Sequence, residues 1–79
     1  KVPRDLSGAD LARALTKLGY RITRQSGSHL RLTVDVPRQH HVTVPMHDPI
    51  KVGTLAAIVG DVAIHLRLGR DEVMERLFG

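Results

Sequence analysis

The residues Gln25-Ser26-Gly27-Ser28-His29 place a histidine directly after a tight turn and at the start of an alternating sequence, Leu30-Arg31-Leu32-Thr33-Val34-Asp35-Val36. Side chains alternate between the two faces of a β-strand, so this sequence predicts one apolar face, formed by Leu30, Leu32, Val34 and Val36. His29 and Arg31 then lie together on the opposite, polar face. A group that titrates near neutral pH beside a fixed cation suits chemistry on an anion, above all on phosphate.

His29 is the candidate catalytic residue because one well-placed base is enough to begin RNA cleavage. It would remove the proton of the 2′-hydroxyl, whose oxygen then attacks the adjacent phosphorus; base catalysis of this kind contributes about 10²–10⁴-fold to a rate. Cationic and polar donors would stabilise the charge on the phosphate, and the candidates for this RNA-binding role are Arg24, Ser28, Arg31 and Lys51. DNA lacks the 2′-hydroxyl, so this route selects RNA. The alternative is that His29 only contacts phosphate.

The remaining histidines give two auxiliary candidates and no metal site. The leaving 5′-oxygen needs a proton, for which water, His41 and His47 are the candidates. The adjacent His40 and His41 point apart, and no carboxylate stands at a convincing ligand spacing, so neither a metal nor another cofactor is predicted. His65 is interpreted as an ordinary surface or half-buried helix residue.

Composition narrows the class of protein. The chain has 79 residues, which predicts one domain over residues 1–79, and it contains no cysteine, which excludes disulfides and thiol catalysis. Between Asp10 and Asp35 there are five basic side chains and no acidic one, which favours a phosphate-bearing partner. No apolar run approaches the roughly 20 residues of a membrane span. We therefore expect a cytoplasmic protein without a membrane partner.

Hydrophobic periodicity predicts the element order α-β-β-β-α-α. Ser7 and Asp10 predict a capped first helix that ends at Gly19. Strands are expected at 20–25, 30–36 and 41–45, followed by helices at 53–68 and 70–78, with Gly60 as a point where the longer helix could break. The simplest arrangement is an α+β fold, a three-stranded antiparallel sheet with all helices on one face. The open face is expected to carry Arg21, Thr23, Gln25, His29, Arg31, Thr33, His41 and Thr43.

Four segments in order resemble one known family: Leu15-x-x-Leu18-Gly19-Tyr20, Arg24-Gln25-Ser26-Gly27-Ser28-His29, Val42-Thr43-Val44-Pro45-Met46-His47 and Lys51-Val52-Gly53-Thr54-Leu55-x-x-Ile58. Together they resemble the HicA toxin family, also called YcfA-like. The resemblance implies a double-stranded-RNA-binding-domain-like fold, ribosome-independent cleavage of mRNA, and neutralisation by a HicB antitoxin. It also implies that the histidine of Gly-Ser-His, His29, is catalytic. Two other hypotheses remain: a non-catalytic RNA-binding module of the same fold, and a protein-interaction domain.

Overall fold

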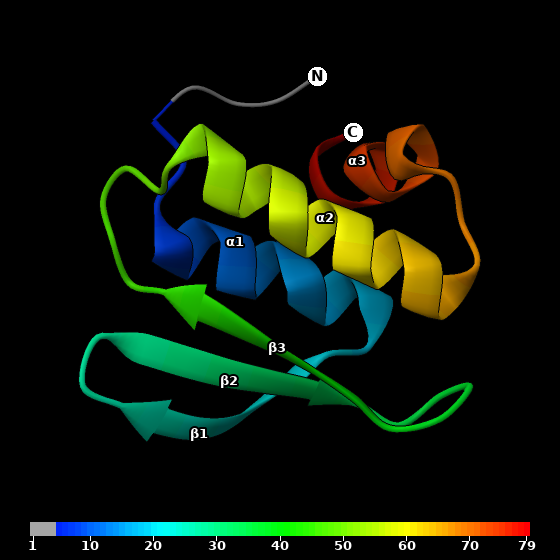
Figure 1. Cartoon of the computed structure of the whole chain (residues 1–79), viewed down its shortest axis with the longest axis horizontal. Helices are drawn as coiled ribbons and strands as arrows, with labels where there is room; N and C mark the ends of the chain where they lie inside the picture. Colours follow the sequence, from blue (N-terminus) through cyan, green and yellow to red (C-terminus); the bar gives the residue numbers. More distant parts are fainter. Residues whose placement is uncertain (1–4) are drawn as a thin grey trace.

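The computed structural model describes residues 5–79 and confirms the predicted element order (Figure 1). The chain runs through α1 (Gly8–Leu15), its 3₁₀ continuation η1 (Thr16–Leu18), β1 (Arg21–Ser26), β2 (His29–Val34), β3 (His40–Pro45), α2 (Val52–Leu66) and α3 (Arg70–Phe78). The three strands form one antiparallel sheet in the order β1-β2-β3. The fold is therefore α+β, as expected; its likeness to a double-stranded-RNA-binding domain stays a prediction.

The helices lie on one side of the sheet, where the apolar side chains of β2 and β3 form the core with them (Figure 1). Leu30, Leu32 and Val34 of β2 and Val42 and Val44 of β3 are all buried. We call this side the inner face and the opposite side the outer face. Helices α1 and α2 contact β3, while α3 packs against α1, η1 and α2. Among residues 5–79, no helix covers the outer face.

Val36, which the sequence predicts on the apolar face, is exposed, and so is Ile22 of β1. Strand β2 ends at Val34, so Val36 lies in the connection to β3 and is 67% exposed. Pro37 follows it, and a proline has no N–H to continue a ladder. Ile22 pairs with Leu32 on the inner face but is 56% exposed, because β1 is an edge strand whose six residues are all exposed.

The first helix is fixed at its start by the predicted capping box. The Ser7 side chain accepts a hydrogen bond from the backbone N–H of Asp10 (3.0 Å), and the Asp10 carboxylate accepts one from the Ser7 N–H (3.3 Å). These bonds hold the pKa of Asp10 below its ordinary value. Leu11 and Leu15 on the same helix are fully buried, so α1 is anchored both by its cap and by its apolar stripe.

Helix α2 does not break at Gly60, which corrects that expectation. It runs without interruption from Val52 to Leu66. A Cβ at Gly60 would collide with the guanidinium of Arg70, which crosses the helix there and donates to the carbonyl of Ala56 (2.9 Å). Because Gly60 has no side chain, Arg70 of α3 can reach across α2 and bond to it. This contact adds to the buried Val73 and Leu77, which hold α3 in the core.

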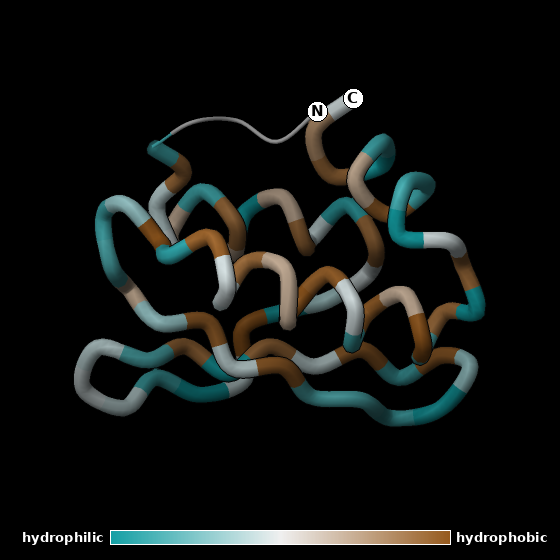
Figure 2. Tube along the Cα trace, turned by 45° about the horizontal axis from the view of Figure 1, so that its top comes forward, coloured by the Kyte–Doolittle hydropathy of each residue, from teal (hydrophilic) through white to brown (hydrophobic). Residues whose placement is uncertain are grey.

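Hydropathy follows this layering. In Figure 2 hydrophilic and hydrophobic colours alternate along the strands of the β1–β2 hairpin, whereas hydrophobic colour dominates α2. Within residues 5–79 no single helix is long and apolar enough to cross a membrane; α2 and α3 pass a test of length and composition only as a pair bent by 107°, which is weak evidence for a span.

Candidate nucleic-acid interface

His29 is the first residue of β2 and lies on the outer face at the edge of the hairpin turn. It pairs across the sheet with Ser26 of β1 and Pro45 of β3, and its side chain is exposed. Gly27 takes the positive φ (57°) that the tight turn requires. The carbonyl of Ser28 accepts a short hydrogen bond from the N–H of Met46 (2.6 Å). The backbone on both sides of His29 is therefore held, while its imidazole remains accessible.

A β-bulge in β1 determines which basic side chain of this strand lies on the same sheet face as His29. Ile22 pairs with Leu32, but the next pair is Arg24 with Arg31, so Thr23 is an extra residue that opposes no partner of its own. The side-chain alternation of β1 is reversed beyond this point. Arg24 lies on the outer face opposite Arg31, whereas Gln25 pairs with Leu30 on the inner face. The expectation that Gln25 lies on the open face is therefore wrong.

The two arginines form a like-charged pair directly across the sheet, an arrangement that costs stability in an isolated hairpin. Nearby Asp35 does not relieve it, because its carboxylate pairs with Arg21 (Nη1 to Oδ2, 2.8 Å). Among residues 5–79, neither Arg24 nor Arg31 has a carboxylate partner, and the Nε of Arg31 is buried without a hydrogen-bond acceptor. Two adjacent cations, one of which has an unmet donor, attract an anion.

A chain of hydrogen bonds crosses the outer face beside these arginines. The hydroxyl of Thr33 contacts the hydroxyl of Thr23 (2.8 Å) and Nδ1 of His41 (2.7 Å), and Thr23 also reaches the carbonyl of Arg31 (3.3 Å). Covered by these neighbours, Thr33 is only 2% exposed, although the sequence predicts it on the open face. Thr33 of the central strand thus connects all three strands, through the bulged Thr23 of β1 on one side and His41 of β3 on the other.

The two auxiliary histidines differ in their distance from His29. His41 lies four residues before Pro45, the partner of His29, a separation of about 14 Å along an extended strand. His47 lies only two residues after Pro45, in the loop to α2, and is exposed. Its carbonyl accepts a hydrogen bond from the N–H of Gly8 (2.8 Å), which ties this loop to the start of α1.

Lys51 is the residue that precedes α2, and its side chain is exposed. Helix α2 begins at the same end of the molecule as the hairpin turn, but in the helical layer (Figure 1). Ser28 is exposed in the turn itself. The structure thus gathers His29, Ser28, Arg24 and Arg31 on the hairpin and leaves Lys51 outside that group. No three histidine or acidic side chains among residues 5–79 lie close enough to hold a metal ion.

Sequence reasoning missed a second cluster, at the opposite end of the sheet. Nε2 of His40 donates to Asp61 of α2 (3.2 Å), and its Nδ1 accepts from the hydroxyl of Tyr20 (2.7 Å). Burial, with a smaller contribution from the charge of Asp61, raises the pKa of Tyr20 to about 12, so the phenol stays a donor. The imidazole of His65 stacks on that of His40, with ring centroids 4.3 Å apart and planes within 10°. The i, i+4 spacing of Asp61 and His65 on one helix face is the signal that could have indicated it.

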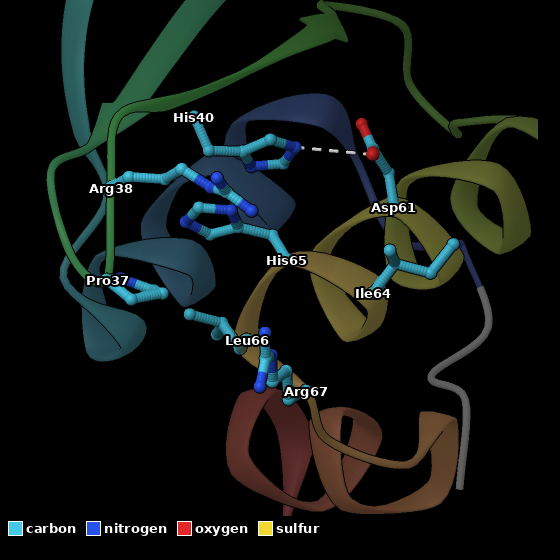
Figure 3. A pocket seen from close by; sticks show the side chains of 8 residues that line it. All are labelled: Pro37, Arg38, His40, Asp61, Ile64, His65, Leu66 and Arg67. Atoms are coloured by element: carbon cyan, nitrogen blue, oxygen red, sulfur yellow. Dashed lines mark hydrogen bonds and ion pairs between the residues drawn. The ribbon is translucent and has the colours of Figure 1, made fainter.

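Of these residues, His40, Asp61 and His65 line a cleft of about 920 Å³ between the β2–β3 connection and the C-terminal half of α2 (Figure 3). The candidate residues on the outer face are not among its lining residues. Arg38 and Arg67 enter the same cleft, so histidines and arginines occur together in two separate places on this small molecule.

Comparison with known families decides the relationship. The family model of the HicA toxin of bacterial toxin–antitoxin systems matches residues 8–66. The chain belongs to the HicA toxin family. The match spans α1, the whole sheet and α2 of this HicA-family chain, and it ends before α3. Neither the comparison with curated proteins nor that with solved structures finds a significant match. Family membership makes the chain a toxin of a toxin–antitoxin pair, and it implies an antitoxin partner and an RNA target.

Proposed function

We propose that this HicA-family chain is a metal-independent endoribonuclease that cleaves mRNA in the cytoplasm, with His29 as its general base. The observation that carries the proposal is the position of an accessible imidazole on the same sheet face as two unpaired arginines, Arg24 and Arg31. His29 and Arg31 are two residues apart on one strand, about 7 Å along it, which is the scale of one nucleotide's sugar and phosphate.

The cleavage step balances without a metal ion or cofactor. His29 takes the proton of the 2′-hydroxyl, the 2′-oxygen forms a bond to phosphorus, and the bond from phosphorus to the 5′-oxygen breaks. The products are a 2′,3′-cyclic phosphate and a 5′-hydroxyl, and the latter needs one proton. Arg31 and Arg24, which have no carboxylate partner among residues 5–79, stabilise the charge that develops on the phosphate oxygens.

For the proton donor we favour His47 or water over His41. A donor and a base that act on one phosphodiester must both lie within hydrogen-bond reach of it. The separation of about 14 Å between His41 and Pro45 along β3 is too large for that. His47 is anchored through its backbone two residues beyond Pro45, at the same end of the sheet as His29.

The antitoxin partner is proposed to be HicB-type and to inhibit by covering the outer face. A partner that presents a carboxylate beside His29 would satisfy Arg24 and Arg31 and exclude RNA at the same time. A toxin–antitoxin complex in which the outer face remains open to RNA would contradict this mode of inhibition.

An RNA digest in EDTA tests the activity, with wild type compared to His29→Ala and Gln25→Ala. Gln25 is an exposed hairpin residue on the inner-face side, so its variant controls for changes in the hairpin itself. We expect wild type and Gln25→Ala to give cyclic-phosphate products and His29→Ala to lose about 10²–10⁴-fold in rate. Unchanged cleavage by His29→Ala would refute the mechanism. RNA binding without product from wild type would make the chain a binding module.

A further inference from the structure

The cleft at the β2–β3 end has the dimensions and composition of a ligand site. Its volume of about 920 Å³ lies within the range of roughly 300–1,000 Å³ typical of small-molecule sites. Figure 3 shows Arg38 entering it from the β2–β3 connection, His40 from the start of β3, and Asp61, Ile64 and His65 from α2. Cationic, flat and apolar side chains therefore surround one space.

The flat part of the lining is a rigid stack. The Tyr20 ring meets His40 edge-on, with centroids 5.9 Å apart, and His65 stacks face to face on the other side. Each imidazole is also held by a hydrogen bond: His40 to Asp61, and His65 from Nε2 to the carbonyl of Val36 (3.3 Å). Because a carboxylate and a carbonyl only accept, both Nε2 atoms carry the proton. The two rings are already held in place before binding, so stacking of a planar ligand on them would cost the protein little conformational entropy.

The cationic part consists of Arg38 and Arg67. Among residues 5–79, neither guanidinium has an ion-pair or hydrogen-bond partner, although both line the cleft. Arg67 has φ 57° and ψ 42°, the left-handed conformation at the end of α2, where glycine is the residue without strain. The one acid present, Asp61, already accepts from His40. The cleft thus presents two free cations and one engaged carboxylate.

We propose that this cleft binds a nucleotide, with its base against the His40–His65 stack and its phosphate between Arg38 and Arg67. A phosphate alone would use the arginines but leave the flat and apolar lining without a function. Stacking of a base on aromatic rings is a main source of affinity in single-strand binding proteins, and arginine is the preferred bidentate partner of phosphate. The exposed side chain of Ile64 adds an apolar edge for the base.

The source of the nucleotide is either a free mononucleotide or one residue of an RNA strand. The cleft is distinct from the outer face: the pairs His29–Pro45 and Val34–His40 are five residues apart, about 17 Å along the sheet. Binding in the cleft does not depend on His29. Only the RNA-strand source rests on the proposed function, since a strand cleaved at the hairpin would need to extend to this end.

Calorimetric titration of the full chain with 5′-AMP and with inorganic phosphate, at one ionic strength, tests the site. We expect 5′-AMP to bind at least about tenfold more tightly than phosphate because only it can stack. Arg67→Gly removes one guanidinium and relieves the left-handed backbone, so this variant should fold and should bind 5′-AMP about tenfold more weakly. Arg76→Gln, on α3, removes the same charge from another surface and is the matched control.

Short single-stranded RNA, titrated into the cleavage-deficient His29→Ala protein with and without Arg67→Gly, separates the two sources. Weaker RNA binding upon Arg67→Gly assigns the site to an RNA residue; weaker 5′-AMP binding alone assigns it to a free nucleotide. The proposal is overturned if 5′-AMP binds no better than phosphate, if Arg67→Gly has no more effect than Arg76→Gln, or if Arg67→Gly weakens only the antitoxin complex. The 5′-AMP titration requires no cleavage, so its failure is distinguishable from failure of the ribonuclease proposal.

Discussion

The part of the outer face around His29 and the cleft contain the same types of residue and differ in whether the imidazole beside the arginines is free. On the outer face, His29 is exposed, and its ring has no hydrogen-bond partner in the described part of the chain. In the cleft, both rings are stacked on each other and hydrogen-bonded, one of them to a carboxylate. A base must accept a proton from a substrate, whereas a stacking surface must stay in place. The partners of a histidine, rather than the number of histidines in the chain, therefore indicate its role.

The two regions also differ in how they hold their cations. Strand pairing forces Arg24 and Arg31 together on the outer face, at a cost in stability. In the cleft, Arg38 and Arg67 come from a connection and a helix end. The first arrangement is rigid and suits a charge that develops at a fixed point. The second suits a ligand that enters and leaves.

The largest expected effect is that substitutions of the two histidines change different properties: His40→Ala lowers stability, whereas His29→Ala removes cleavage. His40→Ala leaves the buried Tyr20 hydroxyl without its partner and should lower the free energy of unfolding by about 1–3 kcal/mol. His29→Ala should change it by less than about 0.5 kcal/mol, while it abolishes cleavage. Urea denaturation of both variants measures this. Equal destabilisation by the two substitutions would remove the distinction between a free and a structural histidine.

The next effect concerns which hairpin residue contacts RNA. Arg24→Gln should reduce the slope of log binding constant against log salt concentration by about one, because one phosphate contact is lost. Gln25→Ala should leave the slope unchanged, since Gln25 lies on the inner-face side of the bulge. Titrations of RNA at several salt concentrations, in the His29→Ala background, measure both slopes. The opposite result would mean that β1 keeps a regular alternation in solution.

A smaller effect is the loss of stability at alkaline pH that Tyr20, in the cluster around His40, should cause. The pKa of Tyr20 is about 12 in the folded protein and near its ordinary value of 10 when unfolded. The stabilisation by the neutral phenol is therefore complete below pH 10 and is lost as pH rises from 10 to 12. Tyr20→Phe should lack this loss. The chain has one tyrosine, so tyrosinate absorbance reports Tyr20 alone; a midpoint near pH 10 in the folded protein would contradict the burial of its hydroxyl in the cluster.

The smallest effect tests the charge balance of the outer face. Asp35→Asn frees Arg21 from an ion pair in which both side chains are 56% exposed. Such a pair contributes about 0–1 kcal/mol, so stability should change little. RNA affinity should rise modestly at low salt and converge with that of wild type at high salt. A fall in affinity would show that Asp35 orders the face rather than only neutralising it.

Much of the fold could be predicted from the sequence because its signals are local. The Ser7–Asp10 box, the glycines at 19 and 27, and the change of period from two to 3.6 after Pro45 define the elements. His29 and Arg31 were placed on one face by simple alternation, and their pairing in the sheet confirms that placement. Their catalytic and RNA-binding roles stay predictions.

The errors come from features that depend on tertiary structure. Alternation could not reveal the bulge at Thr23, so Gln25 was assigned to the wrong face. Burial of Thr33 depends on contacts from two neighbouring strands. The cluster around His40 joins Tyr20, His40 and His65 across 45 residues of sequence, and no local pattern predicts that the rings of Tyr20 and His65 both contact that of His40. The spacing of Asp61 and His65 by four residues is the one local sequence signal of this cluster.

The bulge also has an evolutionary consequence for the hairpin. Because Ile22 keeps its pairing with Leu32, and Arg24 its pairing with Arg31, Thr23 is a residue that the ladder accommodates without a partner. Deleting its codon would restore a regular two-residue repeat and still leave Arg24 opposite Arg31, at the cost of the hydroxyl bridge to Thr33. β1 can therefore become one residue shorter at this position while Arg24 stays opposite Arg31 on the outer face. When such hairpins are aligned, a one-residue gap belongs at Thr23, because shifting the strand instead would match inner residues with outer ones.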